Sequence, residues 1–287
     1  MKFINLIKKI IKLISRKFKK FLHSRRSIEN GSTKLNVVST FLIYGSGGWG
    51  SYKMKEKVVI NSINQTPEAL SRFAQSNNNN VDFEKKLKNF IKKEDDLSLK
   101  LKSLLNFYGS DKASNHDYHL LYSSIISEIG IVSKIFEIGI GTNNPRIVST
   151  MGHNGKPGAS LRAFRDFTSE AQIYGADIDK DILFKEERIN TFYLDQTNLD
   201  TFTDLRSKIG TNFNLMIDDG LHSLNTNLNS LKFFLDNLAV GGYGIIEDVD
   251  HQSKPFYLVV SDLIKEKYLS SLIKFKNSSL FVVKRIS

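Results

Sequence analysis

The feature that most constrains the fold of this chain is an alternation of short apolar runs and amphipathic segments over residues 134–287. The apolar runs are KIFEIGI, AQIYGADI, NTFYLD, FNLMIDD and GGYGIIED, and the clearest amphipathic segments are GASLRAFRDF and NTNLNSLKFFLDNL. Strands that alternate with helices predict a parallel sheet with helices on both faces. The last two runs, LSSLIKFK and SLFVVKRI, are separated only by Asn277 and Ser278, so they predict an antiparallel hairpin at the sheet edge.

The predicted fold is therefore α/β and Rossmann-like, with a mostly parallel sheet of seven strands that ends in this hairpin. A length of 287 residues suits one large domain or two small ones. The run of four asparagines at residues 77–80 is typical of a linker. We predict a separate helix over residues 1–28, an auxiliary region and linker over residues 29–100, and the α/β domain over residues 101–287.

The excess positive charge of the chain lies almost entirely in residues 1–28. The formal net charge is +11, and this segment holds ten of the Lys and Arg residues and no acid. Its isoleucines and phenylalanines recur at helical spacing, which predicts a basic amphipathic helix on an anionic membrane surface. Lysines interrupt every apolar run, which argues against a spanning helix or signal peptide. Packing on protein is the alternative, and nucleic acid is not an expected partner because the remainder is nearly neutral.

Two absences in the sequence narrow the chemistry further. The chain has no cysteine, which excludes disulfides, thiolate metal sites and a cysteine nucleophile and mildly favours a reducing compartment. The glycine-rich stretch Gly45–Gly50 is not followed by the Lys-Ser/Thr pair of a phosphate-binding loop, so it predicts a turn.

Glycines and acids follow three successive predicted strands, where doubly wound folds bind nucleotide cofactors. They are Glu137, Gly139 and Gly141 after the first strand, Asp177 after the second, and Asp195 and Gln196 after the third. The third glycine of a dinucleotide fingerprint is replaced by Asn144, which weakens an NAD interpretation. S-adenosylmethionine (SAM) fits better. We expect Glu137 near its positive groups, Asp177 on the ribose, and Asp195 and Gln196 at the adenine edge, the alternative being a purely structural glycine turn.

The next two strands end in acids and one histidine. The stretch IDDGLH contains Asp218, Asp219 and His222, and the following strand ends at Glu247 and Asp248. Clustered carboxylates call for a cation, and oxygen ligands favour Mg²⁺. We predict Asp219, Glu247 and Asp248 as ligands, with Asp218 on the other face of its strand. His222 is the predicted general base, because histidine titrates near neutrality. A solvated acidic turn with an idle histidine is the alternative.

Several motifs together resemble the metal-dependent sugar O-methyltransferases of macrolide tailoring and the related cephalosporin-hydroxylase and rhamnosyl O-methyltransferase group. They are YGSDKASNHDY, FEIGIGTNNPRIVSTMGHNGKPGASLRAFRDF, IYGADIDKDILF, DQTN, DDGLH, NLNSLKFFL and GGYGIIEDV. The resemblance implies a class I, SAM-dependent and Mg²⁺-requiring methyl transfer to a sugar hydroxyl. It also implies that the acids of DDGLH and IIEDV bind the metal, that the histidine is the base, and that Tyr108 and Lys112 of YGSDK contribute to the cofactor pocket.

The expected protein is therefore a cytoplasmic O-methyltransferase, peripheral at the inner face of the membrane and homo-oligomeric. Its expected acceptor is a carbohydrate or glycoconjugate, from a surface polysaccharide, a lipid-linked sugar or a natural product. Residues 1–100 do not match the auxiliary region of the macrolide enzymes, so a macrolide acceptor is not carried over. The competing hypotheses are an oxidation of the cephalosporin-hydroxylase kind and a non-catalytic membrane-associated binding protein on the same fold.

Overall fold

The computed structural model describes residues 69, 79–92, 94–250, 253–275 and 278–287. The chain divides into two compact units, Met1–Thr66 and Pro67–Ser287. The first unit lies outside the described residues, so the basic helix over residues 1–28 and the turn at Gly45–Gly50 stay predictions. In the described part of the chain, no helix is both long and apolar enough to cross a membrane.

The described unit is built on a sheet of eight strands in the order β3-β4-β2-β1-β5-β6-β8-β7. The strands are β1 (Lys134–Ile138), β2 (Gln172–Asp177), β3 (Lys185–Glu186), β4 (Ile189–Tyr193), β5 (Phe213–Asp218), β6 (Leu238–Ile246), β7 (Tyr268–Lys274) and β8 (Ser279–Arg285). The parallel order β4-β2-β1-β5-β6 and the β7–β8 hairpin confirm the sequence prediction. The prediction of seven strands is one short, because the two-residue β3 pairs antiparallel with β4.

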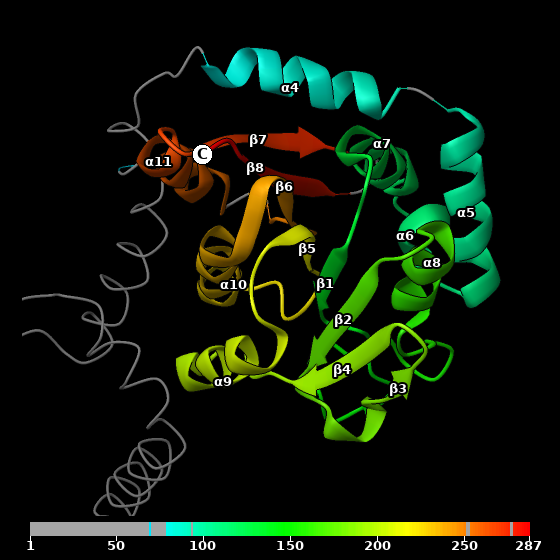
Figure 1. The fold of residues 1–287 in the computed structure, drawn as a ribbon. Helices are drawn as coiled ribbons and strands as arrows, with labels where there is room; N and C mark the ends of the chain where they lie inside the picture. Colours follow the sequence, from blue (N-terminus) through cyan, green and yellow to red (C-terminus); the bar gives the residue numbers. More distant parts are fainter. Residues whose placement is uncertain (1–68, 70–78, 93, 251–252, 276–277) are drawn as a thin grey trace, which may run out of the picture. The chain divides into compact units, whose positions relative to one another are not determined.

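Helices cover both faces of the sheet, and each face has its own core (Figure 1). Successive side chains of a strand point to opposite faces, so Ile135 belongs to one core and Phe136 to the other. One core includes side chains of α4 (Asn79–Phe90), α5 (Asp96–Tyr108), α7 (His119–Ile129) and α8 (Ala159–Phe167). The other includes side chains of α9 (Leu199–Ile209), α10 (Leu224–Asn237) and α11 (Lys254–Ile264). The predicted helices GASLRAFRDF and NTNLNSLKFFLDNL are confirmed as α8 and α10.

The segment before the sheet packs on the same core as the strands. Phe83 and Leu87 of α4 and Leu101 and Leu105 of α5 are fully or almost fully buried there. Asp95 starts α5 with a reciprocal capping box to Ser98, which satisfies amide groups that a helix start leaves unpaired. The expected domain boundary between residues 100 and 101 thus falls inside α5, whereas the compact unit begins at Pro67.

The end of α5 determines where the next side chains lie. Gly109 ends the helix in the left-handed conformation, with φ of 83°, which suits glycine because it has no Cβ. Ser110 then caps the short helix α6 (Asp111–Ser114), which carries Lys112. α7 follows within a few residues. The segment over residues 109–122 therefore approaches the sheet beside the ends of β1, β5 and β6, as the contacts below show.

The direction of the chain through the sheet reverses between β1 and β5. From β1 the chain adds β2 and β4 on one side, and it then returns to add β5 and β6 on the other. In open α/β sheets, ligands bind outside the carboxyl ends of the strands at such a switch point. The predicted site residues that follow β1, β2, β4, β5 and β6 all belong to this edge.

Candidate active site

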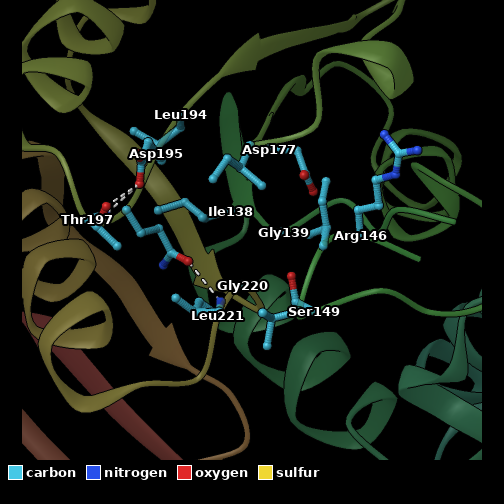
Figure 2. A pocket seen from close by; sticks show the side chains of 14 residues that line it. Ile138, Gly139, Arg146, Ser149, Asp177, Leu194, Asp195, Thr197, Gly220 and Leu221 are labelled. Carbon is cyan, nitrogen blue, oxygen red and sulfur yellow. Dashed lines mark hydrogen bonds between the residues drawn. The ribbon is translucent and has the colours of Figure 1, made fainter. Parts of the chain in front are cut away.

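Two cavities meet at the switch point. The smaller, of about 280 Å³, is lined by residues that follow β1, β2, β4 and β5, together with part of the insert between β1 and α8 (Figure 2). The larger, of about 580 Å³, adds α6, the rest of that insert and the end of β6. Gly139, Ser149, Asp177 and Gly220 line both cavities, so the two spaces adjoin. Together they form one site with a nucleotide-sized compartment and a larger polar one.

The glycine turn after β1 passes very close to the turn after β5. Gly139 and Gly141 have φ of 81° and 84°, a conformation that other residues rarely adopt. A Cβ atom placed on Gly139 would lie 2.1 Å from the backbone oxygen of Asp219. Glycine is therefore needed at this position, both for its backbone conformation and for the close approach of the two turns.

Asp177 holds the same turn from the end of β2. Its carboxylate accepts hydrogen bonds from the backbone amides of Ile140, at 3.0 Å, and Asp179, at 2.9 Å. Burial raises the pKa of the Asp177 carboxyl, although these amide donors oppose the shift. A carboxylate has lone pairs beyond the two used here, and Asp177 lines both cavities. It is thus placed to accept hydrogen bonds from a ligand's hydroxyl groups, as predicted for the ribose.

Asp195 and Gln196 line the smaller cavity, and Figure 2 shows Asp195 beside Leu194 and Thr197. The Gln196 amide is already committed within the protein. Its nitrogen donates to Asp218 and Ser230, both at 2.8 Å, and its oxygen accepts from the backbone amide of Leu221 at 2.9 Å. Gln196 therefore supports the turn after β5 and borders the cavity. Asp218 is buried and accepts from Gln196, whereas Asp219 accepts from Lys112, so the two neighbouring acids have different partners. Burial raises the pKa of Asp218 to about 6.

The acids after β5 and β6 converge with the predicted base. Single ligand atoms of Asp219, His222 and Asp248 all lie within 4.8 Å of one another. Nε2 of His222 is 3.6 Å from Oδ1 of Asp219. His222 and Asp248 have φ of 54° and 51°, which is uncommon for residues other than glycine. Such strain is concentrated at functional sites. We refer to Asp219, His222 and Asp248 as the acid–histidine cluster.

Glu247 points to a different partner from Asp248. Lys112 from α6 donates to Oε2 of Glu247 at 2.7 Å and to Oδ2 of Asp219 at 2.6 Å, and it lies 3.2 Å from Oε1 of Glu137. The Tyr122 hydroxyl donates to Oε1 of Glu247. Burial would lower the pKa of Lys112, but the three carboxylates outweigh it and raise that pKa well above its ordinary value. Burial and the charge of Asp219 raise the pKa of Glu247.

Asp248 is held by the start of α7. The Tyr118 hydroxyl donates to Oδ1 of Asp248 at 2.6 Å and also contacts Ser278. His116 stacks on the Tyr118 ring at 4.9 Å, and its Nδ1 is 4.0 Å from the same Asp248 oxygen. Sequence reasoning did not identify Tyr118 or Tyr122 as site residues, because aromatic side chains at helical spacing are typical of core packing. Tyr118 belongs to the quoted motif YGSDKASNHDY, which was the one available signal.

The structure does not bring every predicted cofactor residue to the cavities. Glu137 is fully buried, accepts from Ser160 at 2.6 Å and does not line either cavity, so it faces Lys112 where SAM was expected. Tyr108 also lies off both cavities, and its hydroxyl donates to Asp166 of α8. Lys112 does line the larger cavity, but its ammonium group is taken up by the acids. Tyr108 and Lys112, which the family resemblance assigns to the cofactor pocket, are therefore bonded to other side chains of the protein.

The donor set fits a divalent cation. Carboxylate oxygens of Asp219 and Asp248 lie within 4.8 Å of each other, with His222 beside them, and carboxylate oxygens are the ligands that Mg²⁺ prefers. The Lys112 ammonium is also surrounded by three carboxylates, those of Asp219, Glu137 and Glu247. One positive charge does not balance three negative charges, so a further cation nearby would be favourable. The smaller cavity fits a nucleoside, because apolar Ile138, Ile178, Leu194 and Leu221 line it beside Asp177 and Asp195.

Comparison with solved structures identifies the fold as that of class I methyltransferases. The MycE methyltransferase from the mycinamycin biosynthetic pathway, in complex with Mg, SAH and mycinamycin VI, superposes with a TM-score of 0.54 at 22% identity. The match covers 65% of this chain and 53% of that one. Crystal form 1 of the same enzyme, in complex with Mg and SAH, gives a TM-score of 0.52 at 24% identity, over 65% of this chain and 55% of that one.

The sequence is similar to sugar O-methyltransferases of natural-product pathways. It is 32% identical over 116 residues to demethylmacrocin O-methyltransferase of Streptomyces fradiae, across 40% of this chain and 27% of that enzyme. It is 26% identical over 151 residues to 8-demethyl-8-alpha-L-rhamnosyl tetracenomycin-C 2'-O-methyltransferase of Streptomyces olivaceus, across 52% of this chain and 38% of that enzyme. The chain thus spans well under half the length of these relatives. No family model matches the sequence.

Proposed function

We propose that this protein is a SAM-dependent, Mg²⁺-dependent O-methyltransferase that transfers a methyl group to a hydroxyl of a sugar. The observation that carries the proposal is the position of the acid–histidine cluster. It lies on the wall of the larger cavity, next to the nucleoside-sized cavity marked by Asp177. A cation site and a base therefore adjoin a place for a methyl donor. The similarity to sugar O-methyltransferases points to the same chemistry.

The proposed roles divide between the two cavities. SAM would lie with its ribose at Asp177, its adenine between Leu194, Asp195 and Gln196, and its methionine part along the turn at Gly139 and Gly141. Mg²⁺ would be held by Asp219 and Asp248, with Glu247 as a further ligand after release from Lys112. When bound, SAM supplies an electrophilic methyl group and Mg²⁺ supplies the positive charge that makes a neighbouring hydroxyl more acidic.

His222 is the proposed general base. Its Nε2 is oriented by Asp219 at 3.6 Å, and the side chain is accessible from the larger cavity. A neutral imidazole there would accept the proton of the sugar hydroxyl while the hydroxyl oxygen bonds to the methyl carbon and the methyl–sulfur bond of the donor breaks. Asp219 then stabilises the imidazolium, because a carboxylate close to a protonated histidine favours the charged form. This chain's own residues thus account for the proton that the reaction releases.

The acceptor is proposed to be a carbohydrate or glycoconjugate. The larger cavity is lined by hydroxyl, amide and charged groups, including Ser110, Asp111 and Asn154, which suits a ligand rich in hydroxyls. We further propose that residues 1–28 bind an anionic membrane surface. The protein would then lie in the cytoplasm at the inner face of the membrane, as a homo-oligomer. Cephalosporin-hydroxylase-like oxidation is not favoured, since its usual facial triad has two histidines and one carboxylate. The cluster has the opposite ratio.

Transfer of labelled methyl groups tests the proposal. Purified protein is incubated with radiolabelled SAM and with nucleotide sugars, lipid-linked sugars or purified glycans, in Mg²⁺ or in EDTA. Label is expected in at least one acceptor class with Mg²⁺ and not with EDTA. If no acceptor gains label in either condition, the methyltransferase proposal fails and the binding-protein hypothesis gains support. Label transfer that is insensitive to EDTA would support the methyltransferase proposal but contradict the requirement for a metal.

A further inference from the structure

Lys112 is an unusual buried group among the residues that the structure describes. It is 2% exposed, and its ammonium group contacts Asp219, Glu247 and Glu137. A buried charge of this kind is costly to remove from water, and it persists only when partners satisfy it. The three acids come from three different strands. Asp219 follows β5, Glu247 follows β6, and Glu137 lies within β1. One lysine thus ties together the three central strands at the site.

Lys112 forms hydrogen bonds to Asp219 and Glu247 and an ion pair with Glu137. Tyr122 donates to the second oxygen of Glu247, and Ser160 donates to the second oxygen of Glu137. The second oxygen of Asp219 is different, because it faces Nε2 of His222 in the acid–histidine cluster. Asp219 is therefore shared between the internal cation Lys112 and the proposed metal position. Lys112 therefore contacts two of the proposed metal ligands, Asp219 and Glu247.

We propose that Lys112 is a positioning residue that serves as a resident counter-ion for the metal site. It holds Asp219 and Glu247 in place before a divalent cation binds, and it limits the affinity for that cation. The limit arises because two positive groups that share Asp219 repel each other, and because Glu247 must leave the ammonium to become a ligand. This inference rests on the proposed function, since it requires a divalent cation at Asp219 and Asp248.

Substitution Lys112→Met separates this role from a merely structural one. Removal of the ammonium leaves two buried carboxylates, Glu137 and Glu247, and the partly exposed Asp219 without their internal cation, so the metal-free variant should unfold at a lower temperature than the wild type. The same loss makes the site one charge more negative, so Mn²⁺ should bind at least about tenfold more tightly. Mg²⁺ should then raise the unfolding temperature of the variant by more than it raises that of the wild type.

Two further variants make the test specific. Lys156 lines the same cavity with an exposed side chain, so Lys156→Met makes the same change in net charge away from the three acids. It should alter Mn²⁺ affinity by less than about threefold, because exposed charges are screened. The double variant Lys112→Met/Glu247→Gln removes one positive and one negative group from the network. It should recover metal-free stability relative to Lys112→Met, and it supplies a soluble variant if the single one does not fold.

The experiment measures Mn²⁺ affinity by electron paramagnetic resonance of free Mn²⁺, and unfolding temperature with and without Mg²⁺, on the full chain. Tighter Mn²⁺ binding and a larger Mg²⁺ effect in Lys112→Met, but not in Lys156→Met, support the inference. Unchanged or weaker binding in Lys112→Met, or an equal gain in Lys156→Met, overturns it while the proposed function stands. If neither wild type nor variant binds Mn²⁺, the metal site of the proposed function fails as well.

Discussion

The two halves of the site are built in different ways. The half that follows β1, β2 and β4 is made of turns, backbone amides and apolar side chains, with Asp177 holding the glycine turn. The half that follows β5 and β6 is made of charged side chains, the buried Glu247 and the partly exposed Asp219 and Asp248. Lys112, Tyr118 and Tyr122 donate hydrogen bonds to them from another part of the chain. The first half is shaped to surround a ligand. In the proposed function, the second half holds a cation and moves a proton.

If the proposed function holds, this difference means that the fold separates cofactor recognition from the methyl-transfer chemistry along its sheet. The cofactor half depends on steric fit, so small changes of volume should damage it. The reaction half depends on charge, so isosteric changes that remove a charge or a hydroxyl should damage it. The predictions that follow test whether a change in one half leaves the ligand of the other half bound as in the wild type.

The largest effect is expected in the reaction half. His222→Gln removes the proposed base and should lower kcat by about 10²- to 10⁴-fold, the usual contribution of general base catalysis. SAM affinity, measured by calorimetry, should change by less than about threefold, because His222 does not line the smaller cavity. His153→Gln is the control, since His153 lines neither cavity. If kcat falls by less than about threefold in His222→Gln, the assignment of His222 as the general base is wrong.

The next effect concerns the point where the two halves touch. Gly139→Ala places a Cβ 2.1 Å from the backbone oxygen of Asp219, and we expect a loss of about 3 kcal/mol in the free energy of unfolding. Gly241→Ala is the matched control, because its φ of 84° is nearly the same and its Cβ would meet no atom within 4 Å. It should cost about 1–2 kcal/mol from backbone strain alone. Equal losses in urea denaturation would show that the close approach is unimportant.

A smaller effect is expected from Asp177→Asn in the cofactor half. Loss of a charged hydrogen-bond partner should weaken SAM binding by about 10- to 100-fold. Mg²⁺ affinity should stay within about threefold, because Asp177 lies outside the acid–histidine cluster. Titration calorimetry measures both, with the exposed Asp181→Asn as control. A parallel loss of Mg²⁺ affinity would show that the two halves are not independent.

The smallest effect is expected at the flank of the reaction half. Tyr118→Phe keeps the ring that stacks on His116 but removes the hydroxyl that donates to Asp248 at 2.6 Å. Groups that orient a metal ligand commonly change metal affinity by about tenfold or more, so a loss of about tenfold in Mn²⁺ affinity is expected. SAM affinity should not change. Wild-type Mn²⁺ affinity in Tyr118→Phe would mean that Asp248 needs no support from α7.

Most of the sheet could be predicted from sequence because its signals are local. Each strand is a short apolar run bounded by turn residues, and the order of strands and helices restricts the topology. The β3 strand was missed because two residues give no detectable period. The convergence of Asp219, His222 and Asp248 was also predictable, since parallel strands end at the same edge of a sheet.

The partners of the buried acids could not be predicted in the same way. Glu137, Lys112 and Tyr108 were expected around SAM, yet Glu137 and Lys112 pair with each other and Tyr108 bonds to Asp166. Lys112 and Glu247 are 135 positions apart, and no local pattern encodes which acid a distant lysine will meet. Charge pairing of this kind depends on how α6 packs against the sheet, which only the folded structure shows.

The most direct test of the division between the two halves is calorimetric titration of Mg²⁺ and SAM, separately, into the wild type and into Asp219→Asn. The account predicts that the variant loses Mg²⁺ binding by about 100-fold or more, because it removes charge from the centre of the reaction half, while SAM binds within about threefold of the wild type. Retention of wild-type Mg²⁺ affinity, or a comparable loss of both ligands, would contradict it.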